Sequence, residues 1–110
     1  MVYFWSTGCA VCRDSLPELR ANQMGWKDKA FTLVTVNIDK YAADWRAYEQ
    51  ILARTRPPAP GLVTLRQDTD APVPGKLPVT LLLNAQGQVV SRFEGRLAPE
   101  VWDAVADLLQ

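Results

Sequence analysis

The opening stretch of the chain constrains its fold most, because an apolar run leads into a short turn and then into a segment with two cysteines. Val2–Trp5 is apolar at every position, as expected of a strand that is covered on both faces. The residues at 6–8 are Ser, Thr and Gly, which are typical of turns and helix caps. Cys9 and Cys12 follow at helical spacing. The sequence therefore predicts a strand, a tight turn and a helix that begins at two thiols.

This first helix is expected to run from Cys9 or Ala10 to Met24, with Gly25 as its stop. A second strand is predicted at Phe31–Ile38, which is rich in β-branched residues and apolar at nearly every position. We expect this second strand to be parallel to the first and buried.

The segment after the second strand predicts another helix. Asp39 is a residue type that caps helices, and the helix is expected to continue to about Arg54. Large apolar side chains recur in this segment at spacings of three and four and would form one face: Tyr41, Trp45, Tyr48 and Leu52. We interpret this face as part of the core.

The second half of the chain begins with a proline-rich connection. Six of the eight prolines fall in Pro57–Pro78, which is interpreted as a constrained loop interrupted by a short apolar segment at Leu62–Leu65. Val79–Leu83 and Val89–Phe93 are predicted strands, and the five residues between them are short enough for an antiparallel hairpin. Pro99 suits the first position of a final helix.

The predicted order of elements is β-α-β-α-β-β-α, which implies two parallel crossovers and one antiparallel hairpin. The expected fold is α/β, with a mixed sheet of about four to five strands and helices on both faces. With 110 residues, the chain is expected to form one domain over 1–110. Because Met1 leads directly into a buried strand, we also expect that the sequence is trimmed at its N-terminus.

Composition excludes several functions. Twelve basic and twelve acidic residues cancel, so no general charge favours nucleic acid or an anionic membrane surface. The chain has no His, which excludes a His general base and every His-containing metal site. No apolar stretch approaches the roughly 20 residues of a membrane helix, and no signal peptide opens the sequence.

The two cysteines carry the only obvious reactivity. Cys9 would face the unpaired N–H groups and the positive dipole end of the helix, which favour a thiolate, so it is the predicted nucleophile. Cys12, one helical turn later, can attack a mixed disulfide formed at Cys9 and is the predicted resolving thiol. The pair could instead be a structural staple, although a disulfide across two residues constrains the unfolded chain little. A Cu(I) site or a zinc ion shared by two chains also remains open.

Motifs along nearly the whole chain resemble the thioredoxin superfamily. Phe4–Cys12, followed by Leu16–Pro17, is similar to its F-W-x-x-x-C-x-x-C…P active-site segment. In the same order, Val36–Asp39, Leu77–Thr80 and Leu83–Gly87 resemble segments of the TlpA/ResA-like branch of extracytoplasmic thiol reductases. The resemblance implies a thioredoxin-like fold.

The resemblance also implies a substrate-binding region. Pro78 would be a cis-proline beside the cysteine pair, and Leu77 would present backbone groups to the substrate's strand. Trp5 would flank the active site or serve as a core aromatic. Gly8 stands where these reductases often have a large residue, which would leave Cys9 more open.

A second departure concerns the proton. ResA-like proteins carry a Glu three residues after the second cysteine, whereas this chain has Ser15 there. Asp14 and Glu18 are nearby but could equally be solvated helix charges. The sequence therefore leaves the proton acceptor for Cys12 open.

The expected function is thiol–disulfide exchange in the direction of reduction, because only the helix end stabilises the Cys9 thiolate while Asp14 opposes Arg13. The expected partners are protein thiol or disulfide substrates and an upstream electron-donor thiol protein, with a monomeric chain, no cofactor and no nucleic acid. The resemblance implies a location outside a bacterial cytoplasm, where such reductases serve cytochrome c assembly. A thioredoxin-like binding or metal-carrying module without turnover is the alternative.

Overall fold

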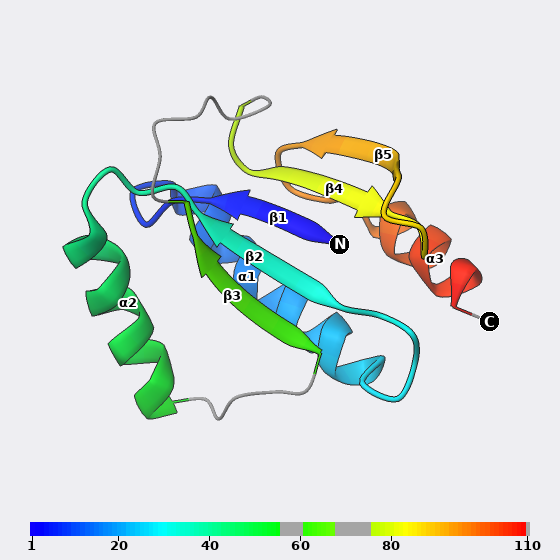
Figure 1. Cartoon of the computed structure of the whole chain (residues 1–110), viewed down its shortest axis with the longest axis horizontal. Coiled ribbons are helices and arrows are strands. Elements are labelled where there is room, and N and C mark those ends of the chain that lie inside the picture. The colour runs from blue at the N-terminus through cyan, green and yellow to red at the C-terminus, as the bar shows by residue number, and fades with distance from the viewer. Residues whose placement is uncertain (56–60, 68–75, 110) are drawn as a thin grey trace.

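The computed structural model describes residues 1–55, 61–67 and 76–109, which form a five-stranded mixed sheet with three helices (Figure 1). The elements in chain order are β1 (Val2–Trp5), α1 (Ala10–Gly25), β2 (Leu33–Asn37), α2 (Ala42–Thr55), β3 (Leu62–Arg66), β4 (Val79–Leu83), β5 (Val89–Glu94) and α3 (Pro99–Leu108). The predicted α/β class and the thioredoxin-like arrangement are confirmed. None of the described helices is long and apolar enough to cross a membrane.

The strands lie in the order β3-β2-β1-β4-β5. β1 and β3 both pair with β2 in parallel, whereas β4 is antiparallel to β1 and to β5. The carboxyl ends of three parallel strands therefore meet at one edge of the sheet. The loop that leads to Cys9 follows β1 at this edge, next to the loop that follows β2.

The apolar segment at Leu62–Leu65 is a strand, so its interpretation as part of a loop was wrong. Leu62–Arg66 forms β3, which pairs residue by residue with β2. It is an edge strand, and Val63 and Leu65 remain 41% and 51% exposed. Most of the prolines around it fall at 56–60 and 68–75, outside the described residues.

The predicted cap of the second helix was also wrong. α2 begins at Ala42, and the Asp39 carboxylate instead accepts hydrogen bonds from Thr7. Tyr41 precedes the helix and is 63% exposed, so it does not join the core as expected. The other members of the predicted face, Trp45, Tyr48 and Leu52, are half-buried.

The two faces of the sheet differ in burial. On β2, Leu33, Thr35 and Asn37 are buried, whereas Val34 and Val36 on the opposite face are half-buried. Both parallel crossovers step the same way along the sheet, and right-handed crossovers in one direction put their helices on the same side. Figure 1 shows α1 behind the sheet and α2 beside the β3 edge. The described helices therefore lie over the more buried face of the sheet and beside its β3 edge.

Candidate functional site

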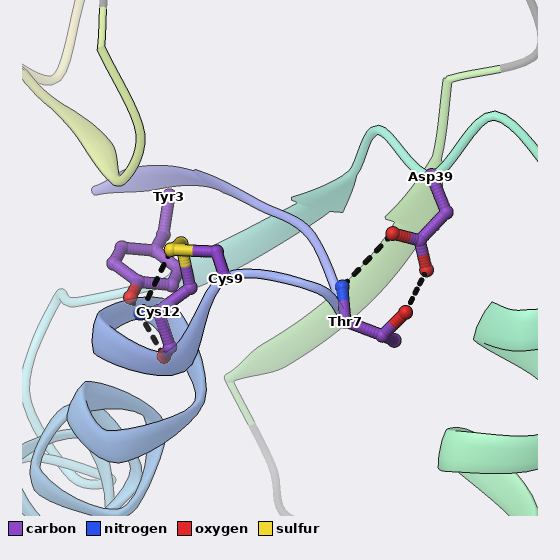
Figure 2. The surroundings of a disulfide bond; sticks show 5 residues. All are labelled: Tyr3, Thr7, Cys9, Cys12 and Asp39. Carbon is purple, nitrogen blue, oxygen red and sulfur yellow. Dashed lines mark hydrogen bonds between the residues drawn. A yellow bond between two sulfur atoms is a disulfide. The ribbon is translucent and has the colours of Figure 1, made fainter.

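The cysteine pair lies where the turn after β1 becomes a helix. Cys9 is the N-cap of α1, with extended backbone angles, and its Sγ accepts the backbone N–H of Cys12 at 3.1 Å. The backbone N–H of Cys9 donates to Ser6 at 3.2 Å, which closes the turn. A disulfide bond joins Cys9 to Cys12, whose Cα atoms are 5.2 Å apart (Figure 2).

The two sulfur-bearing residues differ in access to solvent. Cys12 is completely buried, whereas Cys9 is half-buried and has exposed neighbours at Gly8 and Val11. The first turn of α1 contains no acidic residue, so no negative charge there disfavours a thiolate at the start of the helix. An attacking substrate can therefore reach the first sulfur and not the second.

The Leu77–Pro78 peptide bond is cis, which confirms the conformation that the resemblance implied. Pro78 is buried and directly precedes β4, whose Val79 pairs with Phe4 on β1. This register puts Pro78 at the end of β1 that leads to the cysteines. Its carbonyl accepts the N–H of Gly95 at 2.8 Å.

Trp5 lies in the core beneath the site. It is 2% exposed, and its ring packs against that of Tyr48 on α2, with centroids 5.2 Å apart. This burial supports the core role, while substrate contact by Trp5, Gly8, Leu77 and Pro78 stays a prediction.

The Asp39 carboxylate holds the loop before Cys9, a contact that was not predicted from the sequence. Asp39 accepts the Thr7 backbone N–H at 2.9 Å and the Thr7 hydroxyl at 2.8 Å (Figure 2). Asn37 donates to the same carboxylate at 3.2 Å, and Arg66 donates to the Asp39 carbonyl at 2.9 Å. One signal in the sequence could have predicted this contact: Thr7 and Asp39 are polar residues that follow two adjacent parallel strands, β1 and β2.

A phenol lies against the buried side of the pair. The Tyr3 hydroxyl donates to the Cys12 carbonyl at 2.9 Å, and Tyr3 is 1% exposed (Figure 2). Burial raises the pKa of Tyr3 far above its usual value, against a smaller opposing effect of the nearby Ser15 hydroxyl. The phenol therefore stays neutral at physiological pH.

Glu18 is not a solvated helix charge. Its Oε1 accepts the indole N–H of Trp102 at 2.8 Å, and its Oε2 accepts from Arg96 at 3.2 Å. Asp14, by contrast, is exposed. The part of the chain that the structure describes contains no group of three or more His, Cys, Asp or Glu side chains that could hold a metal ion.

No family model and no curated protein matches this chain. Solved structures do. A proposed thiol:disulfide interchange protein DsbE from Chlorobium tepidum is 25% identical, with a TM-score of 0.68 over 96% of this chain and 73% of that one. The thioredoxin domain of a thiol-disulfide oxidoreductase from Bacteroides vulgatus is 24% identical, with a TM-score of 0.72 over 99% and 77% of the two chains. StoA from Bacillus subtilis is 20% identical, with a TM-score of 0.67 over 93% and 79%.

These similarities agree with the sheet order, the cis-proline and a cysteine pair at the start of α1. The chain is therefore a member of the thioredoxin superfamily, and within it resembles the TlpA/ResA-like thiol–disulfide oxidoreductases.

Proposed function

We propose that this protein reduces protein disulfides by dithiol–disulfide exchange through Cys9 and Cys12. The observation that carries the proposal is the unequal burial of two cysteines that already form a disulfide at the start of a helix. A half-buried thiolate at the helix end can attack a substrate, and a buried thiol one turn later can complete the exchange.

The reaction takes two steps. The Cys9 thiolate attacks one sulfur of the substrate disulfide, and the other substrate sulfur leaves as a thiolate and takes up a proton. Cys12 then loses its proton and attacks Cys9 Sγ, which releases the second substrate sulfur and closes the Cys9–Cys12 disulfide. Two electrons pass to the substrate, and an upstream thiol protein returns them to the pair.

The direction of reaction follows from the surroundings of Cys9. The Cys12 N–H and the end of α1 are the groups that favour its thiolate, and they predict a moderate pKa depression. A thiolate that is only moderately stabilised makes the reduced pair a good electron donor. Reductase activity is therefore the proposed direction.

The proposed substrates are proteins, and they would bind over the exposed surface at Gly8 and beside Leu77 and Pro78. We propose a location outside the bacterial cytoplasm and a role such as cytochrome c maturation, supported by the resemblance to extracytoplasmic reductases. A monomer that needs no resident cofactor is sufficient for this chemistry.

Insulin reduction with dithiothreitol as electron source tests the proposal. Cys9→Ser is expected to fall to the rate of dithiothreitol alone, because the attacking sulfur is gone. Cys12→Ser is expected to accumulate a covalent complex through Cys9, which electrophoresis without reductant detects. Equal rates for wild type and Cys9→Ser would indicate a binding module. Bound copper or zinc in protein purified under reducing conditions would indicate a metal carrier.

A further inference from the structure

The turn before Cys9 is held by groups other than the two sulfur atoms. The backbone N–H of Cys9 donates to Ser6 at 3.2 Å, so Thr7 and Gly8 are the two central residues of this turn. Thr7 is bound at two points, since its backbone N–H and its hydroxyl donate to the Asp39 carboxylate at 2.9 and 2.8 Å (Figure 2). The turn is therefore fixed at its centre by a side chain 32 residues further along the chain.

Asp39 is itself held on the loop that follows β2. Its backbone N–H donates to the side chain of Asn37 at 2.9 Å, and the Asn37 amide donates back to its carboxylate at 3.2 Å. Arg66 at the end of β3 donates to the Asp39 carbonyl at 2.9 Å. Asn37 is completely buried and pairs with Trp5 at the end of β1. The sheet thus fixes the carboxylate to which Thr7 binds.

The position of the turn determines what the Cys9 sulfur contacts. Cys9 is the N-cap of α1, with extended backbone angles, and its Sγ accepts the Cys12 N–H at 3.1 Å. This N–H and the end of the helix are the groups that favour a thiolate. A side chain reaches such an N–H only from the extended backbone that an N-cap adopts. A turn that is free to move would therefore take the sulfur away from the groups that stabilise its charge.

We propose that Asp39 is a positioning residue for the exchange reaction. Through Thr7, it holds the turn so that Cys9 Sγ stays at the start of α1 after the disulfide has opened. The inference rests on the exchange proposed above for Cys9. Opening of the disulfide removes the bond to Cys12, whereas the hydrogen bonds between Thr7 and Asp39 involve neither sulfur. Asp39 therefore acts in the reduced protein, which is the state that attacks a substrate.

The charge of Asp39 and its hydrogen bonds have opposite effects on Cys9. The negative charge disfavours a thiolate, so its removal alone would make Cys9 more reactive. Loss of the hydrogen bonds to Thr7 would make Cys9 less reactive, because the sulfur would leave the Cys12 N–H. The two effects can therefore be told apart. Other charged side chains next in sequence to the turn and to Asp39 are exposed, so that water screens them: Arg13, Asp14 and Lys40.

Alkylation of Cys9 by iodoacetamide tests the proposal. The experiment uses reduced protein with Cys12→Ser, in which Cys9 is the only thiol and the backbone N–H at residue 12 remains. Asp39→Ala removes the charge and both hydrogen bonds to Thr7, whereas Asp39→Asn removes the charge and keeps an oxygen for the Thr7 N–H. At about pH 7 the Asp39→Ala rate is expected to be about threefold or more below the Asp39→Asn rate, because less of Cys9 is ionised.

The pH profile separates positioning from a general loss of reactivity. The two rates are expected to approach each other at high pH, where Cys9 is fully ionised in both variants. Asp44→Asn removes an exposed carboxylate from the first turn of α2 and is the control that should keep the wild-type rate. Equal rates at about pH 7 for Asp39→Asn and for Asp39→Ala that is folded by circular dichroism would overturn the positioning role.

If Asp39→Ala does not fold, a pair of variants at Thr7 decides. Thr7→Val removes the hydroxyl that binds Asp39 and Thr7→Ser keeps it, while neither changes the charge. Slower alkylation of Thr7→Val is expected, and equal rates would overturn the role. Insulin reduction by the wild type is measured separately. Its absence would refute the reductase and leave the alkylation rates to decide on Asp39, whereas normal reduction with equal alkylation rates would refute only the positioning role.

Discussion

Among the residues around the cysteines, Asp39 connects several segments of the chain by hydrogen bonds. Asp39 connects the loop before Cys9 to the ends of β2 and β3 through Thr7, Asn37 and Arg66. Because hydrogen bonds to a charged group are stronger than neutral ones, we expect this carboxylate to stabilise the loop that presents Cys9.

Asp39→Ala is therefore expected to destabilise the protein by about 2 kcal/mol, because it leaves donors of Thr7 and Asn37 without partners. Thr7→Val, which removes one hydroxyl and keeps the side-chain shape, is the matched variant and should cost about 1 kcal/mol. Urea unfolding of the oxidised protein measures both. If Asp39→Ala unfolds at the wild-type midpoint, the carboxylate does not hold the loop.

The residue-level prediction from sequence succeeded where the chemistry is local. Spacing alone put Cys9 and Cys12 at the start of a helix, because the strand, turn and helix signals are contiguous. Tyr3 and Glu18 had no such signal. Their hydrogen bonds depend on partners that only the packed structure brings close.

At the scale of elements, α1 and α3 pack against each other through both an aromatic contact and a hydrogen bond. The Trp102 ring lies 6.0 Å from that of Trp26 at the end of α1, and its indole N–H bonds to Glu18. Trp102 is 8% exposed. This one side chain therefore joins the last helix to the helix that begins at the cysteines.

Trp102→Ala is expected to cost about 3–5 kcal/mol, since it opens a cavity between the two helices. Trp102→Phe keeps most of the ring and loses the N–H, so a cost of about 1–2 kcal/mol is expected. Chemical denaturation followed by circular dichroism measures the difference. Equal stability of Trp102→Ala and wild type would contradict this role of α3.

β3 shows why one element was misassigned. It has only one neighbour, β2, and three of its five side chains are exposed: Val63, Thr64 and Leu65. A short run among prolines carries no periodicity that separates an edge strand from an extended loop. The strand assignment depends on non-local pairing.

At the scale of the whole molecule, the side chains on one face of the sheet are mostly less buried than those on the other, as Val34 and Val36 on β2 show. α2 packs against the core through Trp45 and Tyr48. On the same helix, burial raises the pKa of Glu49 above 4.5, against a smaller opposing effect of Arg20 on α1. The docking of α2 thus includes a partly buried acid.

The sign of this effect gives a pH prediction. A raised pKa in the folded state means that ionisation of Glu49 disfavours folding. The stability that the neutral side chain contributes is therefore present below about pH 4.5 and is lost as the pH rises through the folded-state pKa. Glu49→Gln is therefore expected to raise Tm slightly at about pH 7 and to have almost no effect near pH 3. Calorimetry at both pH values checks this, with exposed Glu100→Gln as control. A gain confined to low pH would reverse the assignment.

The sequence by itself determined the order of helices and strands, apart from β3, and the position of the two thiols at the start of α1. These features depend on local periodicity, turn residues and spacing, which are readable within a window of a few residues. The resemblance added the cis bond before Pro78, which the structure confirms.

Only the tertiary structure decided which distant groups meet. Thr7 and Asp39 are 32 residues apart in the chain, and Glu18 and Trp102 are 84 apart. Periodicity tells which face of an element is apolar, but crossover direction and strand pairing decide which polar atom that face meets. The thiols were therefore evident from the sequence, whereas the contacts that support them depend on packing.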